Sequence, residues 1–303
     1  MADFVTGEQY EIGAGPYHAV ITEAGAGLRE LTYEGEHLIL TYGPDELAPA
    51  AFGQLLIPWP NRVDRGRYEF DGHRYQLDLS EPELENAIHG LMRWATWTPQ
   101  EQSSDAVALS CALHGSNGYP FRLDVRVEYR LDAATGLSVT VIASNAGTRA
   151  LPYAHGMHPY ITVGQPLDSC MVQLPGALYQ PVDDRMIPLG PPKDVAGSEY
   201  DLREPRLLGE QEIDIAFTGL ERGADGMARV RLSGGGRSTA FWLDQAHPWL
   251  EVYTADQVPE ASRRRGLGCE PMTGPPNALA SGIDLIRLEP GAEYRGSWGI
   301  AVG

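Results

Sequence analysis

The feature of this sequence that most constrains its fold is a succession of short segments in which apolar residues alternate with polar ones. In Leu123–Leu131 every second residue is apolar, which is the period of a β-strand with one buried and one wet face. Alternating or β-branched segments recur roughly every 8–14 residues, without interleaved helices, and this predicts an all-β sandwich or barrel. The others are Tyr17–Thr22, Leu28–Tyr33, Val107–Leu113, Leu137–Ala143, Arg229–Leu232, Thr239–Leu243, Leu250–Thr254, Ile283–Leu288 and Tyr294–Val302.

Turn signals join some of these segments into hairpins. Asp71-Gly72 stands between two alternating runs within Tyr68–Leu77, and this dipeptide is a strong short-range signal for a two-residue hairpin turn. A second hairpin is predicted where a turn at 132–136 separates Leu123–Leu131 from the next strand. Helix-period stretches are scarce, and the best candidates are a turn at Glu81–Glu85 and a helix at Asp256–Arg264.

The chain shows no shift in composition that would mark a domain boundary. Its 35 glycines and 23 prolines are scattered, as expected for turns rather than for a linker. The Pro/Gly-rich stretch Pro188–Asp194 is interpreted as a long loop. We therefore expect one domain spanning residues 1–303.

Charge and cysteine usage exclude several classes of function. With 23 Lys and Arg against 41 Asp and Glu, the net charge is −18, which argues against nucleic-acid binding and, more weakly, against an anionic membrane. No run of about 18 apolar residues would span a bilayer, and the N-terminus lacks the features of a signal peptide. The cysteines, Cys111, Cys170 and Cys269, are few and far apart, which favours reduced thiols in a cytoplasmic protein.

Two segments in the first third of the chain place polar side chains in apolar surroundings. Asn61-Arg62 follows the apolar run Leu55–Trp59, and the guanidinium could hold neighbouring oxygens of a polyol or carboxylate. A structural ion pair of Arg62 with Asp64 or Glu69 is the alternative. His89 lies between an isoleucine and Gly90, where the backbone could approach a ligand closely, although a core histidine is the commoner explanation.

The segment Leu151–Ile161 contains two histidines three residues apart, His155 and His158. The pair could supply two imidazole ligands to a metal, or an acid and a base that exchange protons near neutral pH. Acid–base work is slightly favoured because no cysteine or acid nearby completes a ligand set. A structural role for both histidines stays open.

Glu270 follows a short apolar stretch and precedes three prolines, Pro271, Pro275 and Pro276. Prolines restrict the backbone, so we expect a stiff loop that positions the carboxylate rather than leaving it solvated. A carboxylate, imidazoles and an Asn-Arg pair, with Trp and Tyr nearby, together suit a carbohydrate ligand, whose hydroxyls meet polar groups and whose C–H faces meet aromatic rings.

These motifs, in this order along nearly the whole chain, resemble those of the aldose 1-epimerase (galactose mutarotase) family. The matching segments are Asn61-Arg62 with Gly66-Arg67-Tyr68, Asn86–Gly90, His158-Pro159-Tyr160, Ile213–Phe217, Leu250–Thr254, Cys269-Glu270-Pro271 and Leu288–Trp298. The resemblance implies a supersandwich of antiparallel β-sheets, no cofactor, and interconversion of the α- and β-anomers of an aldose such as galactose or glucose.

The resemblance also implies roles for single residues. Glu270 is expected to take the proton from the anomeric hydroxyl and His158 to protonate the ring oxygen; ring opening, rotation about C1–C2 and closure follow. Substrate binding is expected of Asn61, Arg62, His89, Asp214, Glu251 and His155. Glu251 stands where some members carry Gln, and His155 is an additional histidine that could contact substrate or His158. We expect the acid and the base to face each other across one pyranose ring.

Three other functions stay possible. A hexose-6-phosphate 1-epimerase would need a basic cluster at the mouth of the site, for which Arg65, Arg67, Arg93 and Arg263–Arg265 are candidates. A non-catalytic carbohydrate-binding protein would share the fold, and a metal-dependent lyase or hydrolase could use His155, His158 and Glu270. No metal is expected on the favoured interpretation. The expected partner is a small sugar, and the sequence is compatible with a monomer or a homodimer.

Overall fold

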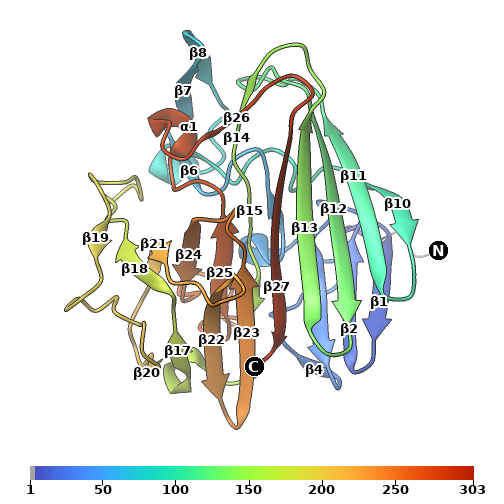
Figure 1. Ribbon diagram of the computed structural model, residues 1–303, viewed down its shortest axis with the longest axis vertical. Helices are drawn as coiled ribbons and strands as arrows, with labels where there is room; N and C mark the ends of the chain where they lie inside the picture. The colour runs from blue at the N-terminus through green and yellow to red at the C-terminus, as the bar shows by residue number, and fades with distance from the viewer. Residues whose placement is uncertain (1–3) are drawn as a thin grey trace.

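The computed structural model describes residues 4–303 and is built almost entirely of antiparallel β-sheets (Figure 1). The prediction of a large antiparallel β-sandwich is confirmed, and all ten segments predicted as strands contribute to strands. Among residues 4–303, no helix has the length and the apolar character that crossing a lipid bilayer requires. That residues 1–303 form one domain stays a prediction, and its first three residues lie outside the described part.

The largest sheet has nine strands in the order β10-β11-β12-β13-β27-β23-β22-β17-β20. Their bounds are β10 Thr98–Gln102, β11 Ala106–Leu113, β12 Leu123–Asp132, β13 Gly136–Asn145, β27 Glu293–Val302, β23 Arg237–Leu243, β22 Ala228–Gly234, β17 Met171–Gln173 and β20 Arg206–Leu207. The predicted β12–β13 hairpin is present, with Asp132 opposite Gly136, and Figure 1 shows it beside the C-terminal strand β27. Burial alternates along both strands, so their apolar residues supply one face of the core.

A second sheet has eight strands in the order β19-β18-β21-β24-β25-β15-β5, with β16 also paired to β25. Their bounds are β19 Lys193–Asp194, β18 Gly176–Tyr179, β21 Asp214–Leu220, β24 Trp249–Tyr253, β25 Leu267–Met272, β15 Gly156–Met157, β16 Tyr160–Ile161 and β5 Leu55–Leu56. Every residue of β25 is buried, because the strand is paired on both sides at the centre of this sheet. Three of the predicted site residues, Asp214, Glu251 and Glu270, lie on strands of this sheet, and His158 lies between β15 and β16.

Smaller elements complete the structure. The N-terminal sheet contains β1 Gln9–Ala14, β2 Tyr17–Thr22, β3 Leu28–Tyr33 and β4 Glu36–His37. Two-stranded pairs are formed by β6 Arg62–Asp64 with β9 Asn86–Ile88, β7 Arg67–Phe70 with β8 His73–Gln76, and β14 Leu151–Tyr153 with β26 Ile286–Leu288. The helical segments are α1 Ala278–Ser281 and the 3₁₀ turns Pro49–Ala51, Pro82–Leu84 and Leu167–Ser169. The predicted Asp71-Gly72 turn connects β7 to β8, with a positive φ at both residues as a type I′ turn requires.

Two local predictions differ from the structure. Residues 256–264 form turns rather than a helix, because Ala255 has a positive φ and Pro259 in the middle of the segment has no backbone N–H to donate. Part of Pro188–Asp194 is ordered into β19, which pairs with β18. The turn at Glu81–Glu85 is confirmed as a 3₁₀ turn that ends at Glu85 in the left-handed region.

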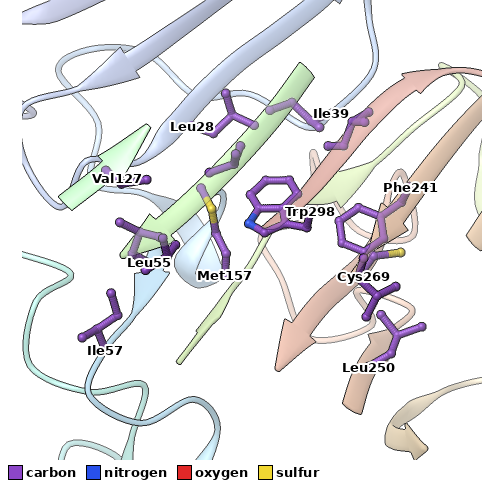
Figure 2. Close-up of a cluster of buried hydrophobic side chains, with 14 of the residues drawn as sticks. Leu28, Ile39, Leu55, Ile57, Val127, Met157, Phe241, Leu250, Cys269 and Trp298 are labelled. Atoms are coloured by element: carbon purple, nitrogen blue, oxygen red, sulfur yellow. The ribbon is translucent and has the colours of Figure 1, made fainter. Parts of the chain in front are cut away.

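The core lies between the sheets and extends to the positions next to the predicted site. Figure 2 shows Met157 and Cys269 among buried apolar side chains that include Trp298 and Phe241. Cys269 precedes Glu270 on β25, and neighbouring residues of a strand point to opposite faces. The core therefore fixes Cys269 on one face of the strand and directs the Glu270 side chain to the other.

Candidate functional site

A cavity of about 290 Å³ opens above the centre of the eight-stranded sheet. Its size suits a small ligand, since sites for drug-sized molecules begin near about 300 Å³. Of the predicted site residues, those that line it are Asn61, Arg62, His89, His158, Asp214 and Glu270. Glu251 lies beneath its wall, and His155 lies elsewhere.

Glu270 and His158 are in direct contact in this cavity. Glu270 Oε1 lies 3.1 Å from His158 Nε2, and the two side chains are only 3% and 7% exposed. The expectation that a pyranose ring separates the two groups is wrong: the two side chains touch each other directly. Glu270 Oε2 and His158 Nδ1 are buried without a hydrogen-bond partner among residues 4–303, and such atoms are costly unless a ligand or water completes them.

Glu270 sits on strand β25, and the predicted stiff loop begins only after Met272. The prolines misled the prediction because proline is rare in a central strand. Pro271 is tolerated because the strand that pairs with β25 is interrupted beside it. β15 pairs with β25 on one side of this interruption, and β16 pairs with β25 on the other. The carboxylate is therefore held by a paired strand, a more rigid support than a loop.

Burial shifts the pKa values of Glu270 and His158 in opposite directions. Burial, together with the positive charges of Arg93 and Arg62, lowers the pKa of His158 to about 3. Burial, and next the neighbouring Asp214 carboxylate, raises the pKa of Glu270 well above its usual value. These shifts favour a neutral imidazole beside a protonated carboxyl. In this arrangement, as in the carboxylate–imidazolium pair, the two groups together hold one proton.

Glu251 lies directly opposite Glu270 on the neighbouring strand β24. It is 2% exposed, and burial, with the carboxylates of Asp214 and Glu270, raises its pKa well above the usual value. Asn61 Nδ2 donates to Glu251 Oε2 at 3.1 Å, and Asn61 adopts a left-handed backbone with φ of 51°. Glu251 is thus placed to hold Asn61 at the cavity wall.

Arg62 pairs with Glu81 rather than with Asp64 or Glu69, the partners considered from the sequence. Its Nε donates to Glu81 Oε2 and its Nη2 to Glu81 Oε1, both at 2.9 Å. This two-pronged bond fixes the guanidinium plane at the cavity and neutralises its charge. The sequence carries no signal for this partner, since Glu81 lies 19 residues away in a predicted turn.

His89 follows β9 with a left-handed backbone, φ 61°, and Gly90 continues this conformation at 70°. A non-glycine residue in this region is strained, and such strain concentrates at functional sites. The His89 ring lies edge-on to His158 with centroids 5.3 Å apart, and its Nδ1 is buried without a partner among residues 4–303. Gly90 serves the fold rather than a ligand, because a Cβ there would lie 2.1 Å from the Ile57 carbonyl oxygen.

Two tyrosines complete the cavity wall. Tyr160 stacks on the His158 ring at 4.9 Å with an interplanar angle of 16°, and its hydroxyl donates to the Ala50 carbonyl. Tyr253 stands opposite Asp214, the first residue of β21, which lines the cavity, and burial raises the pKa of its carboxyl. The sequence predicted aromatic residues near the site in general, but the tryptophans Trp59 and Trp97 are part of the core.

His155 does not line the cavity, so the structure does not place it where it could contact substrate as predicted. It is 1% exposed and hydrogen-bonds Tyr153 and His247 instead. The metal alternative required His155 beside His158 and Glu270, and that set is not assembled. Among residues 4–303, no group of three or more His, Cys, Asp or Glu is placed to hold a metal ion.

The arginines considered for phosphate binding are dispersed. Arg65 and Arg67 line a separate surface hollow with Arg185, and Arg264 pairs with Asp168 and Asp256. Arg93 alone of these candidates lines the cavity. Its guanidinium lies over the exposed Trp94 ring at 5.5 Å and makes one long hydrogen bond, 3.4 Å, to Gln54 Oε1. Burial lowers the pKa of Arg93.

Comparison with known proteins agrees with this architecture. The chain is 37% identical to the uncharacterized protein YihR of Escherichia coli over 291 residues, covering 96% of this chain and 92% of YihR. It is 27% identical to human galactose mutarotase over 268 residues, covering 80% of this chain and 76% of that protein.

Solved structures show the same fold. A GalM/aldose epimerase homologue from C. elegans superposes with a TM-score of 0.85 at 17% identity, covering 97% of this chain and 99% of that one. Galactose 1-epimerase from Lactobacillus acidophilus superposes with a TM-score of 0.81 at 20% identity, covering 96% and 93%. The sequence model of the aldose 1-epimerase family matches residues 8–300. The chain therefore belongs to the aldose 1-epimerase family.

Proposed function

We propose that this protein is an aldose 1-epimerase that interconverts the α- and β-anomers of a hexose such as galactose or glucose. The observation that carries the proposal is the 3.1 Å contact between Glu270 and His158 at the wall of a cavity of about 290 Å³. An anomeric carbon bonds two oxygens, and its interconversion needs one proton removed from the hydroxyl and one delivered to the ring oxygen. Two adjacent proton carriers meet this need.

The shared proton gives the pair a balanced cycle. Glu270 as carboxylate takes the proton of the anomeric hydroxyl while the His158 imidazolium gives its Nε2 proton to the ring oxygen. The C1–O5 bond breaks, C1 becomes a carbonyl carbon, and the pair is left as carboxyl and neutral imidazole. Burial favours this same arrangement before the reaction, so each turnover begins with transfer of the shared proton from Glu270 to His158. Closure on the other face of C1 reverses each transfer and regenerates the ion pair.

The surrounding side chains would hold the sugar during this cycle. Arg62, fixed by Glu81, and Asp214 both line the cavity, where guanidinium N–H groups would donate to sugar hydroxyls and carboxylate oxygens would accept from them. His89 brings an unpartnered ring nitrogen next to His158. Glu251 would act through Asn61 rather than touch the sugar. Acid and base so positioned can each contribute about 10²–10⁴-fold to the rate.

Polarimetry of freshly dissolved α-D-galactose and α-D-glucose tests the proposal. The protein should accelerate the decay to the equilibrium rotation, and Glu270→Gln should slow this by about 10²–10⁴-fold. A decay with wild-type protein equal to that of buffer would refute the proposal. The exposed substitution Glu210→Gln serves as the matched control. We propose action in the cytoplasm, consistent with three free cysteines.

A second candidate, a hexose-6-phosphate 1-epimerase, is favoured by one observation, Arg93. This guanidinium lines the cavity without a carboxylate within ion-pair distance among residues 4–303, unlike Arg62. A phosphate oxygen is a strong partner for such a group. If glucose 6-phosphate is turned over much faster than glucose, and Arg93→Gln removes that difference, the second candidate replaces the first.

A further inference from the structure

A chain of four buried polar side chains runs through the core behind the candidate site. Tyr153 hydroxyl lies 2.9 Å from His155 Nδ1, His155 Nε2 lies 3.1 Å from His247 Nε2, and His247 Nδ1 lies 2.8 Å from Asp244 Oδ1. Tyr153, His155 and His247 are at most 1% exposed. None of the four lines the cavity, so the proposed reaction does not account for them.

The proton positions along this chain follow from Asp244. Its carboxylate oxygens accept from the Ser297 and Ala246 backbone N–H groups at 2.7 and 3.1 Å. In the tautomer that matches these contacts, His247 donates from Nδ1 to Asp244 and accepts at Nε2. His155 must then donate from Nε2 and accept the Tyr153 hydroxyl proton at Nδ1. Burial and the neighbouring His247 lower the pKa of His155, which keeps its ring neutral.

The fold makes room for this chain. A Cβ at Gly296 would lie 2.7 Å from His247 Cε1, so only glycine on β27 leaves space for the ring. Buried polar groups are retained where every member is satisfied, and here each ring nitrogen has a partner. The arrangement is thus a built hydrogen-bonded network that links the nine-stranded sheet to the segment that precedes β15.

His155 connects this network to the catalytic pair. Its backbone N–H donates to Thr273 Oγ1 at 2.8 Å, and its carbonyl accepts from Thr273 N–H at 2.9 Å. His155 lies three residues before His158, and Thr273 lies three residues after Glu270. These two hydrogen bonds tie the segment that carries the His158 imidazole to the strand that carries the Glu270 carboxyl. Pro271, which lies between Glu270 and Thr273, has no backbone N–H and therefore adds no hydrogen bond to this connection.

We propose that His155 is a positioning residue, held by Asp244 through His247, which sets the separation of His158 and Glu270. The inference rests on the proposed function for its effect on rate, but its structural effect can be measured without turnover. Without the hydrogen bonds of the His155 ring, the His155–Thr273 hydrogen bonds would no longer be supported from the nine-stranded sheet. His158 Nε2 would then no longer be held 3.1 Å from Glu270 Oε1.

The test compares His155→Leu with His155→Gln. The glutamine amide can still donate to His247 Nε2, whereas leucine cannot. We expect His155→Leu to lower kcat for the anomerisation by about 10- to 100-fold, since a misplacement of about 1 Å has that order of effect, with KM changed less than about twofold. His155→Gln should restore kcat to within about threefold of wild type. In nitrogen-15 NMR, the ring signals of His158 should shift in the leucine variant and not in the glutamine variant.

A milder variant covers the case in which His155→Leu fails to fold. Tyr153→Phe removes one hydrogen bond from the network, and Tyr68→Phe removes one part-buried hydrogen bond to the Gly118 carbonyl outside it. The first should lower kcat and shift the His158 signals, and the second should do neither. Unchanged His158 signals in Tyr153→Phe, or equal effects of both variants, would overturn the proposal. A wild-type protein without anomerase activity would refute the proposed function instead, and the His158 signals would still decide this inference.

Discussion

The substitution Glu270→Gln should change how stability depends on pH, in addition to removing activity. In the folded wild type the pair holds one proton at weakly acidic pH, on Glu270, while His158 stays neutral down to about pH 3. In the unfolded chain between about pH 4.5 and 6.5 the pair also holds one proton, on the histidine. Folding then neither binds nor releases a proton at this pair, and its contribution to the free energy of unfolding is flat across that range.

Glu270→Gln removes this balance. The folded variant retains His158, whose pKa is lowered to about 3 by burial and by two arginines and not by Glu270. Below about pH 6.5 the unfolded chain binds a proton that the folded variant does not bind, so stability falls as the pH falls. Each pH unit costs up to about 1.4 kcal/mol, and the loss between pH 7 and pH 5 is about 2 kcal/mol relative to wild type.

Urea unfolding at pH 7, 6 and 5 measures this loss, with the exposed Glu210→Gln as the control for a general change of charge. Titrations elsewhere in the chain are common to all three proteins and cancel in the difference. A variant whose stability follows the wild-type pH dependence within about 0.5 kcal/mol would refute the assignment of a neutral, buried His158 that shares one proton with Glu270.

Three further substitutions probe other parts of the account. His158→Gln leaves Glu270 with a raised pKa, so the stability of this variant relative to wild type should fall as the pH rises above about 4.5. Equilibrium unfolding that shows the opposite trend would contradict this expectation. Arg62→Lys loses the two-pronged hydrogen bond to Glu81, so KM for the sugar should rise by about 10-fold while kcat is less affected. An unchanged KM in steady-state polarimetry would show that Arg62 does not bind the sugar. Gly90→Ala brings a Cβ to 2.1 Å from the Ile57 carbonyl oxygen at a φ of 70° and should lower the free energy of unfolding by more than about 2 kcal/mol. A free energy of unfolding within about 0.5 kcal/mol of wild type would show that the loop relaxes freely.

The sequence predicted the long strands because their signal is local. Strands such as β12 and β13 bury every second side chain, so the alternation is visible without knowledge of their partners. The two-residue strands β5, β15 and β16 are too short to show any period, and only their pairing with neighbours defines them. The sequence predicts a loop at Glu270 for a related reason. Proline restricts the local backbone, but whether a strand tolerates it depends on the pairing beside it, which is interrupted next to β25.

The candidate site was partly predictable. The residue types of Glu270, His158, His89 and Arg62 suggested chemistry, and the order of motifs suggested the family. Partners distant in the sequence, such as Glu81 for Arg62, carry no local signal. His155 and His158 looked equivalent in the sequence, yet residues three apart on an extended segment point to opposite sides, which sends one ring to the cavity and the other to the core.

The most direct test of the central claim is a crystal structure of the Glu270→Gln variant soaked with galactose or glucose. The account predicts a single hexose in the cavity, with its anomeric oxygen within hydrogen-bond distance of the residue 270 side chain and its ring oxygen within reach of His158 Nε2. A sugar bound with its anomeric carbon pointing out of the cavity, or bound only outside it, would contradict the assignment of these two residues to proton transfer at C1.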